Sequence, residues 1–435
     1  MLSQKYLKLP RFNYWFISSL VISSIVCIPL IVISTSFFGE LSDYYKLLKD
    51  TYLYLYISNT LALLTGVLVL TFIFGVGSAY LVSFYKFPGS KFFTWALILS
   101  FAVPGYIYAY SLTAFFEYFG NLYSILKFFF GEGNYNDYIP RIDSLLGSIF
   151  SISFSLFIYV YLITRACFIY QSQSQIDAGK NMGFSNYQIF KRILLPSARP
   201  GIVAGLSLVA MECVSDFGTV AFFNVQSLTT AIYDSWIIFD DINTAYQLSF
   251  FLIIFIFIFF AIEKKSRSRS RFNIPSRGYR TVEKVKLYGK IKWLAFSLLL
   301  ILFFFSFIFP VSQMLFWILK FPNNFNFMNL LDLTSNTLKL VLFTTIILIL
   351  LSFVTNYGMR ISENKFLNLV TSFSVSGYAI PGIILAVTLL GFISFVSDYF
   401  NNDNIKILFI GTVFGLIIAY CVRFYSLAIN GIKTG

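Results

Sequence analysis

The stretch from Gln175 to Ile202 reads QIDAGKNMGFSNYQIFKRILLPSARPGI. It is polar and basic, and it lies between two long apolar runs. Within it, Asp177-Ala178-Gly179 is followed after three residues by Gly183, and after nine more by the run Ile193-Leu194-Leu195-Pro196. A helix-forming polar loop between apolar runs is expected to bind another protein outside the membrane.

The composition predicts an integral membrane protein. Of 435 residues, 58% are hydrophobic and 12% are charged, whereas charged residues make up about a quarter of a soluble protein. The first apolar run continues from Tyr14 to about Phe37, too long for a cleavable signal. The four cysteines have no paired spacing, so neither disulfides nor a cysteine metal site is predicted.

An all-α polytopic membrane fold follows from the apolar runs, because a helix needs about 20 such residues to cross the hydrocarbon core. We predict ten spans: 14–37, 56–85, 93–116, 145–168, 200–223, 246–262, 291–319, 335–358, 366–396 and 405–428.

Basic residues predict the orientation, because cytoplasmic loops carry an excess of Lys and Arg. Such residues precede the first span and populate the loop after the fourth, and segment 263–292 holds eleven Lys or Arg against two Glu. We therefore expect the N-terminus and the 175–202 loop to be cytoplasmic. The net charge of +13 then reflects topology and membrane lipid, and no nucleic acid partner is predicted despite the run SRSRSR at 266–271.

The chain repeats itself. Ser58-Asn59-Thr60-Leu61 recurs at 335–338 and Ala102-Val103-Pro104-Gly105 recurs as AIPG at 379–382, both at an offset of 277, and GSIF at 147–150 matches GTVF at 411–414. We predict a first repeat over 1–262, a basic cytoplasmic linker over 263–292 and a second repeat over 293–435. Both repeats start on the same side, so they are parallel rather than inverted.

The motif spacing of the 175–202 loop resembles the EAA loop of ABC-importer permeases. The carried-over positions are Asp177, Ala178, Gly179, Gly183, Ile193, Leu195 and Pro196. Asp177 replaces the usual Glu, and Gly179 replaces an Ala, which weakens a helix by roughly 1 kcal/mol. The resemblance implies tandem repeats of the type I importer fold in the bacterial inner membrane. It also implies ABC ATPase subunits that bind ATP and Mg, and an extracytoplasmic substrate-binding protein.

A narrower resemblance follows the loop. The segment MECVSDFGTV at 211–220, with TTAIY at 229–233 and Trp236, is similar to the fused two-repeat permeases for ferric iron. Permeases for thiamine, polyamine and other small solutes share the architecture and stay as alternatives. The duplication places a second coupling loop at about position 441, and the family pattern implies about twelve spans in all. We therefore expect this sequence to be a fragment of a longer permease.

Two acids in the predicted fifth span are candidates for the translocation pathway. Glu212 and Asp216 are one helical turn apart and are expected on one face. An acid within a span faces a cavity or a partner, so these carboxylates line a cation route or fix helix packing. Tyr106 and Tyr108, next to the kink expected at Pro104, line the same route or pack the bundle.

Missing motifs narrow the function further. The chain contains no G-x4-G-K-[ST] phosphate loop and no histidine, so we expect no ATPase or other enzyme activity, no bound cofactor and no metal site in this chain. Gly201-x3-Gly205 and Gly411-x3-Gly415 are assigned a helix-packing role only. The rival function is a secondary transporter driven by an ion gradient, which would have no use for the coupling loop.

Overall fold

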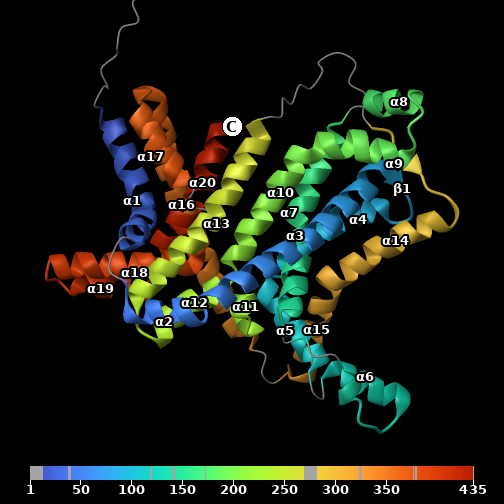
Figure 1. The fold of residues 1–435 in the computed structure, drawn as a ribbon, viewed down its shortest axis with the longest axis horizontal. Helices are drawn as coiled ribbons and strands as arrows, with labels where there is room; N and C mark the ends of the chain where they lie inside the picture. Colours follow the sequence, from blue (N-terminus) through green and yellow to red (C-terminus); the bar gives the residue numbers. More distant parts are fainter. Residues whose placement is uncertain are drawn as a thin grey trace, which may run out of the picture. The chain divides into compact units, whose positions relative to one another are not determined.

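The computed structural model describes residues 13–434 except 38–40, 118–119, 140–141, 143, 172, 269–281, 323–325, 376 and 378–379. Residues 269–281 of the basic linker predicted at 263–292, and with them part of the SRSRSR run, lie outside the described residues. The described chain is helical apart from two two-residue strands, β1 (Tyr85–Lys86) and β2 (Val285–Lys286) (Figure 1).

Nine described segments are long and apolar enough to cross a membrane. They are α1 (Tyr14–Phe37), α3 (Leu53–Phe84), α7 (Leu145–Ile169), the run from α9 (Asn186–Ile189) through η3 (Phe190–Leu194) to α10 (Leu195–Ser215), α13 (Ile242–Ser268), the run from α14 (Gly289–Phe303) through η5 (Phe304–Ile308) to α15 (Phe309–Lys320), α16 (Phe327–Ser362), α18 (Gly382–Tyr399) and α20 (Val413–Thr434). A tenth candidate span is broken by a sharp bend. The all-α polytopic prediction is confirmed.

Shorter helices connect or flank these spans. They are α2 (Asp43–Thr51), α4 (Ser90–Ala96), η1 (Leu97–Ala102), α5 (Gly105–Phe116), α6 (Asn121–Phe130), η2 (Asn136–Tyr138), α8 (Gln173–Asn181), α11 (Gly218–Phe222), α12 (Leu228–Tyr233), η4 (Asp234–Ile238), α17 (Lys365–Val375) and α19 (Asn404–Phe409). The broken span consists of the segments Ser90–Ala102 and Gly105–Phe130, which meet at 90°. The kink predicted at Pro104 is therefore present.

Three predicted spans have wrong boundaries. The predicted span 366–396 is divided between α17, which ends at Val375, and α18, which begins at Gly382. The predicted span 200–223 ends at Ser215, because the carboxylate of Asp216 accepts bonds from the backbone of Thr219 and Val220 and starts α11 instead. Glu212 and Asp216 therefore do not share one helix face. The predicted span 405–428 is also split, because Gly411 has a φ of +71° between α19 and α20.

Contacts divide the chain into two compact units. Unit 1 comprises residues 1–50, 231–253 and 325–435, and unit 2 comprises 51–230 and 254–324. The units do not coincide with the predicted repeats, since α1 packs in unit 1 on α16, α17 and α20, whereas α14 and α15 pack in unit 2 on α4 and α5. Each unit thus contains the first span of the other predicted repeat.

The order of elements also recurs along the chain. A long helix, a short helix, a helix that begins at a Pro-Gly pair, a short helix and another long helix follow one another from α3 to α7 and again from α16 to α20. Pro104 precedes α5 and Pro381 precedes α18. This order is the one that parallel repeats require, and the repeat itself stays a prediction.

Unit 2 is centred on α3, α7 and α10, which pack closely through small residues. A Cβ added to Gly75 would lie 2.6 Å from Cβ of Val160, and one added to Gly205 would lie 2.9 Å from Cα of Val160. An added Cβ at Gly201 would collide with the Cys167 sulfur. The packing role predicted for Gly201 and Gly205 is confirmed. The role predicted for Gly411 is wrong, because its added Cβ would meet nothing within 4 Å.

Unit 1 is held by polar contacts between α1 and the later helices. The Ser19 hydroxyl donates to the carbonyl of Val354 at 3.2 Å, and the hydroxyls of Ser23 and Thr371 lie 3.2 Å apart. Where lipid removes the hydrophobic drive between helices, such contacts and close packing hold them together.

Gly75 and Gly77 provide a matched test of this packing. Gly75→Ala would insert a methyl group against Val160 and lower the stability by about 1 to 3 kcal/mol. Gly77 has open space where its Cβ would lie, so Gly77→Ala leaves stability unchanged or raises it by up to about 1 kcal/mol. Thermal unfolding of the detergent-purified protein measures both. Equal melting temperatures for the two variants would contradict the close approach of α3 and α7.

Candidate functional site

The first candidate site is the predicted coupling loop, residues 175–202, which folds as two helices joined at Gly183. Helix α8 ends in a Schellman motif, in which the amide of Phe184 donates to the carbonyl of Gly179 at 3.0 Å and that of Gly183 donates to Lys180 at 2.9 Å. Gly183 has a φ of +77°, and a Cβ there would meet nothing within 4 Å. Backbone conformation rather than space therefore requires glycine at this position.

A capping box starts α9 directly after this turn. The amide of Ser185 donates to Oε1 of Gln188 at 2.9 Å, and the amide of Gln188 donates to the Ser185 hydroxyl at 3.3 Å. These bonds satisfy amides that the first turn of a helix leaves free. The angle between α8 and α9 is thus set by local hydrogen bonds on both sides of Gly183.

Gly179, the departure from the family pattern, is buried where α8 meets η3. A Cβ there would lie 2.6 Å from Cδ1 of Ile193 and 3.3 Å from Cγ1 of Ile189. The missing methyl group therefore lets α8 approach the next helical segment closely. Ala178 is exposed and Asp177 is half-buried, and Oδ1 of Asp177 accepts a bond from Nε2 of Gln173 at 2.9 Å.

The end of the loop continues into a membrane span without a break. Ile193 lies in η3, Leu195 opens α10 and Pro196 follows it directly. The run Asn186–Ser215 is 30 residues long. A displacement of α9 is therefore passed directly into the span.

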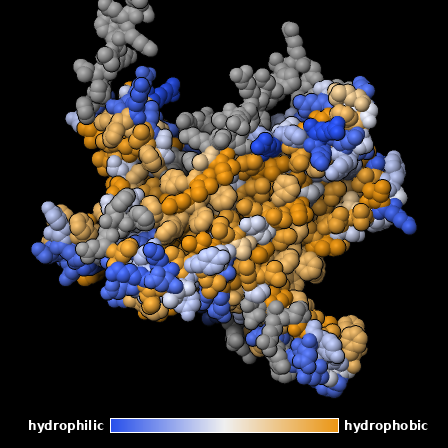
Figure 2. Space-filling view, in the orientation of Figure 1, coloured by the Kyte–Doolittle hydropathy of each residue, from blue (hydrophilic) through white to orange (hydrophobic). Residues whose placement is uncertain are grey.

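The outer face of the loop combines apolar and basic groups. Met182 is 63% exposed and Tyr187 is 69% exposed, and Lys191 and Arg192 are also exposed. Figure 2 shows hydrophilic residues over α8 and α9 at one end of unit 2, next to a hydrophobic face over α3, α7 and α10. Exposed aromatic and basic residues together are typical of a protein docking surface.

The second candidate site lies in unit 2 where two helices are interrupted side by side. Oδ1 of Asp216 accepts from the amide of Thr219 and Oδ2 accepts from the Thr219 hydroxyl, both at 2.8 Å. Gly105, at the break before α5, lies against this pair, since its added Cβ would be 2.7 Å from Oγ1 of Thr219 and 3.5 Å from Oδ2 of Asp216.

The tyrosines of the second site lie in different surroundings. Tyr106 is 54% exposed and approaches Gly218 of α11, whereas Tyr108 is 1% exposed and stacks on Phe154 with ring centres 5.5 Å apart. Glu212 is half-buried on α10. The fold thus brings Tyr106 and Asp216 to the same pair of helix breaks and places Tyr108 in an aromatic core. Thr219 and Gly105 complete this cluster, and no signal in the sequence pairs them.

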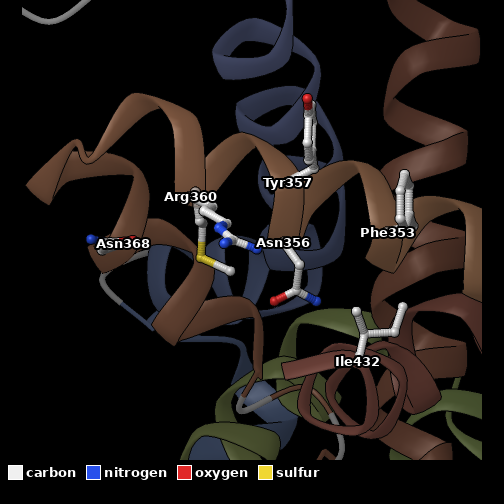
Figure 3. A pocket seen from close by; sticks show the side chains of 7 residues that line it. Phe353, Asn356, Tyr357, Arg360, Asn368 and Ile432 are labelled. Atoms are coloured by element: carbon white, nitrogen blue, oxygen red, sulfur yellow. The ribbon is translucent and has the colours of Figure 1, made fainter. Parts of the chain in front are cut away.

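A cavity of about 420 Å³ opens in unit 1 at the end of α16 (Figure 3). Its lining comprises Phe353, Asn356, Tyr357, Met359, Arg360, Asn368 and Ile432. Tyr357 lies at an offset of 277 from Tyr80, whose ring packs 4.4 Å from that of Phe190 in the coupling loop. In unit 1 the Tyr357 ring instead packs 4.7 Å from Trp15.

Among the residues that the structure describes, no three His, Cys, Asp or Glu side chains are grouped so that they could hold a metal ion. The described oxygen donors of the second site are the Asp216 carboxylate and the Thr219 hydroxyl, in contact with each other. Such a pair can contact a passing cation but lacks the ligands of a closed metal site.

Residues 71–272 match the family described as the binding-protein-dependent transport system inner membrane component. This part of the chain is a domain of that family. The matched residues include the predicted coupling loop and the Asp216 cluster.

The individual proteins that this chain resembles have low sequence identity to it. The Fe(3+)-transport system permease protein FbpB 2 of Haemophilus influenzae is 22% identical over 378 residues, which cover 86% of this chain and 68% of that protein. The sulfate transport system permease protein CysT of Escherichia coli is 23% identical over 155 residues, 34% of this chain and 51% of that one. A bacterial ABC transporter involved in alginate import has a solved chain that is 16% identical, with a TM-score of 0.45 over 56% of this chain and 90% of that chain.

The capping box gives a direct test of the loop structure. Ser185→Ala removes the side-chain bond to the Gln188 amide and lowers the local stability of α9 by about 1 kcal/mol. Ser185→Asp retains an acceptor and keeps the helix. Hydrogen exchange of the 184–192 segment reports the difference. Identical protection in the Ala variant and the wild type would contradict the capping box.

Proposed function

We propose that this chain is the transmembrane permease subunit of an importer for ferric iron, delivered by an extracytoplasmic binding protein and driven by separate ATPase subunits. The coupling loop carries the proposal of ATP-driven transport. It presents an exposed Met182 and Tyr187 on a helix pair of fixed angle, continuous with a membrane span. The ATP and Mg belong to the partner subunit, and the loop is placed in the cytoplasm by its basic residues.

The charges along the second site favour a cation as substrate. From residue 200 to 262 the chain contains acidic residues but no Lys or Arg. No Lys or Arg occurs between Lys91 and Lys127 either. An anion such as sulfate would meet the carboxylates of Glu212 and Asp216 without a compensating positive charge from these segments, whereas a hard cation is stabilised by carboxylate and phenol oxygens. The similarity to a ferric iron permease over most of the chain supports iron among the cations.

In the proposed mechanism the two predicted repeats form a pseudo-symmetric pair that alternates between inward and outward access. ATP-driven closure of the ATPase dimer moves α8 and α9, and the continuous run to Ser215 carries that motion to the Asp216 cluster. Import of thiamine, a polyamine or another small solute is the alternative within this class. A gradient-driven carrier is the alternative outside it.

Uptake into proteoliposomes decides between these functions. The permease is reconstituted with a candidate ATPase and a candidate binding protein, and labelled ferric iron, thiamine, putrescine and sulfate are supplied in turn. We expect iron uptake that requires both ATP and the binding protein. Uptake driven by a proton or sodium gradient without ATP would refute the ABC function, and ATP-dependent uptake of another solute only would refute iron.

Gly183→Asp is expected to uncouple ATP hydrolysis from uptake, because it adds a side chain and a charge on the docking face in a left-handed backbone conformation that costs roughly 1 kcal/mol. Gly411→Asp is the control, since Gly411 also has a positive φ, of +71°, and open space around its Cβ but lies between α19 and α20 in unit 1. Uptake per ATP hydrolysed should fall only in the first variant. Full coupling in Gly183→Asp would remove the loop from the mechanism.

Asp216→Asn separates a charge effect from a capping effect at the second site. Asn retains the oxygen that accepts from the Thr219 amide but loses the charge, so we expect normal amounts of folded protein and at least about tenfold slower iron uptake. Asp216→Ala removes the cap and is expected to lower both the amount of folded protein and the rate of iron uptake. Unchanged uptake in Asp216→Asn would assign Asp216 to packing alone.

A further inference from the structure

Residues 282–288, here called the linker strand, directly precede α14 and lie along the end of α3. Strand β2 within it pairs in parallel with β1, which directly follows α3. The amide of Leu287 continues the pairing by donating to the carbonyl of Lys86 at 3.0 Å. A two-residue pair is marginal by itself, so other contacts must hold this strand in place.

Lys284 supplies one such contact. Its Nζ donates to the carbonyl of Val82 at 2.7 Å, in the last turn of α3. Carbonyls in the last turn lack helical partners and carry the negative end of the helix dipole, so a lysine there is favourable. Partial burial and the charges of Arg165 and Lys86 lower the pKa of Lys284, and the α3 carbonyl offsets this repulsion.

Gln173 supplies the second contact and reaches the coupling loop. Its side chain is buried, with the residue 6% exposed. Oε1 of Gln173 accepts from the backbone amide of Glu283 at 2.9 Å, while its Nε2 donates to Oδ1 of Asp177 at 2.9 Å. One amide group thus joins the linker strand to the first residue of the coupling motif.

Apolar side chains line part of the space between these elements. A cavity of about 50 Å³ between these elements is lined by Tyr80 and Phe84 of α3, Ile176 of α8 and Val285 of the linker strand, among others. Helix α8, α9 and β1 lie together at one end of unit 2 in Figure 1. Without this arrangement α8 would be attached to the rest of the loop mainly by the Gly183 turn and the contact of Gly179 with Ile193.

We propose that the linker strand is a positioning element of the coupling machinery. It holds α8 against the end of α3 through Gln173, so that a displacement of α8 moves α3 and the start of α14 together instead of pivoting at Gly183. This inference rests on the proposed function of the coupling loop. It adds a segment from outside the loop, next to the joint between the predicted repeats, to the parts that transmit the ATPase motion.

Gln173→Leu tests the proposal, because Leu fills a similar volume and removes both hydrogen bonds. We expect hydrogen exchange of α8 to accelerate about tenfold and uptake per ATP hydrolysed to fall, while ATP hydrolysis and the amount of folded complex are retained. Gln173→Glu keeps the acceptor for the Glu283 amide. Its hydrogen exchange rate and its uptake per ATP hydrolysed are expected to be intermediate between those of Gln173→Leu and the wild type. Gln226→Leu, at an exposed glutamine outside the coupling loop, is the matched control.

The outcomes separate this proposal from the function beneath it. If the wild type shows no ATP-dependent uptake, the proposed function fails. If the wild type transports and Gly183→Asp uncouples it, but Gln173→Leu keeps the normal ratio of uptake to ATP, only the linker strand loses its role. A Gln173→Leu complex that loses folded protein and uptake in proportion, with a normal ratio in the surviving fraction, would likewise overturn the proposal.

A crosslink provides a measurement that needs no loss of structure. Tyr85→Cys with Val285→Cys, paired in the sheet, is introduced after Cys27, Cys167, Cys213 and Cys421 have been replaced by serine. Copper phenanthroline should form the disulfide in this pair and not in Tyr85→Cys with Tyr288→Cys. The locked protein should still transport iron, since the two segments are proposed to move as one. Failure to crosslink, or a lock that stops transport, would contradict the proposal.

Discussion

Backbone hydrogen bonding governs where this chain is able to interrupt its helices. Inside hydrocarbon each unsatisfied amide or carbonyl costs several kcal/mol, so a break persists only if protein groups take up the released bonds. At Pro104 the preceding carbonyl, that of Val103, accepts from the Ser155 hydroxyl on α7 at 2.9 Å. At the end of α10 the Asp216 carboxylate takes the amides of Thr219 and Val220. The two breaks come together because Gly105 leaves room for Thr219, which places the acid of the candidate pathway at the one point in the α5 and α10 region where both helices are open.

The backbone amides and carbonyls of the coupling loop also have hydrogen-bond partners at its turn. The Schellman motif and the capping box leave the turn at Gly183 with its amides and carbonyls paired, so the loop has a defined angle despite its exposure. A loop of defined angle transmits force, whereas a loose one absorbs it. The contacts of Gln173 and Lys284 extend this rigidity to the end of α3 through a buried amide and one helix-capping lysine.

Much of the membrane architecture was predictable from the sequence because it depends on local properties. Long apolar runs indicate spans, Pro104 indicates a break, and the polar segment from Asp177 to Pro196 indicates a helical loop with a turn at Gly183. The errors arise where a side chain competes with helix continuation. Asp216 reads as one more position in an apolar run, and only its bonds to Thr219 show that it ends α10. Gly411 reads as a packing residue, although its φ of +71° ends a helix.

Contacts distant in sequence could not be predicted in this way. Gln173 precedes the motif by only a few residues, yet its partner Glu283 lies 110 positions away, and a single sequence carries no signal that joins them. Gly179 is a different case, because the sequence does single it out, as a departure from the family pattern that weakens a helix. The structure shows the departure to be a packing requirement, since Ile189 and Ile193 occupy the space that an alanine methyl group would need.

The exchange of first spans between the compact units has a consequence for assembly. Unit 1 contains α1 from the start of the chain, and unit 2 contains α14 and α15 from beyond the basic linker. The hydroxyl of Ser19 contacts Val354 and the ring of Trp15 packs on Tyr357, which are more than 300 residues later in the chain. Helix α1 therefore makes these contacts only after α16 has been inserted. Neither predicted repeat can therefore complete its packing alone, and a break in the chain at the linker would leave each half with an unpaired first span and an incomplete partner. A single polypeptide keeps these exchanged spans at high effective concentration, which favours the correct pairing over association with another copy.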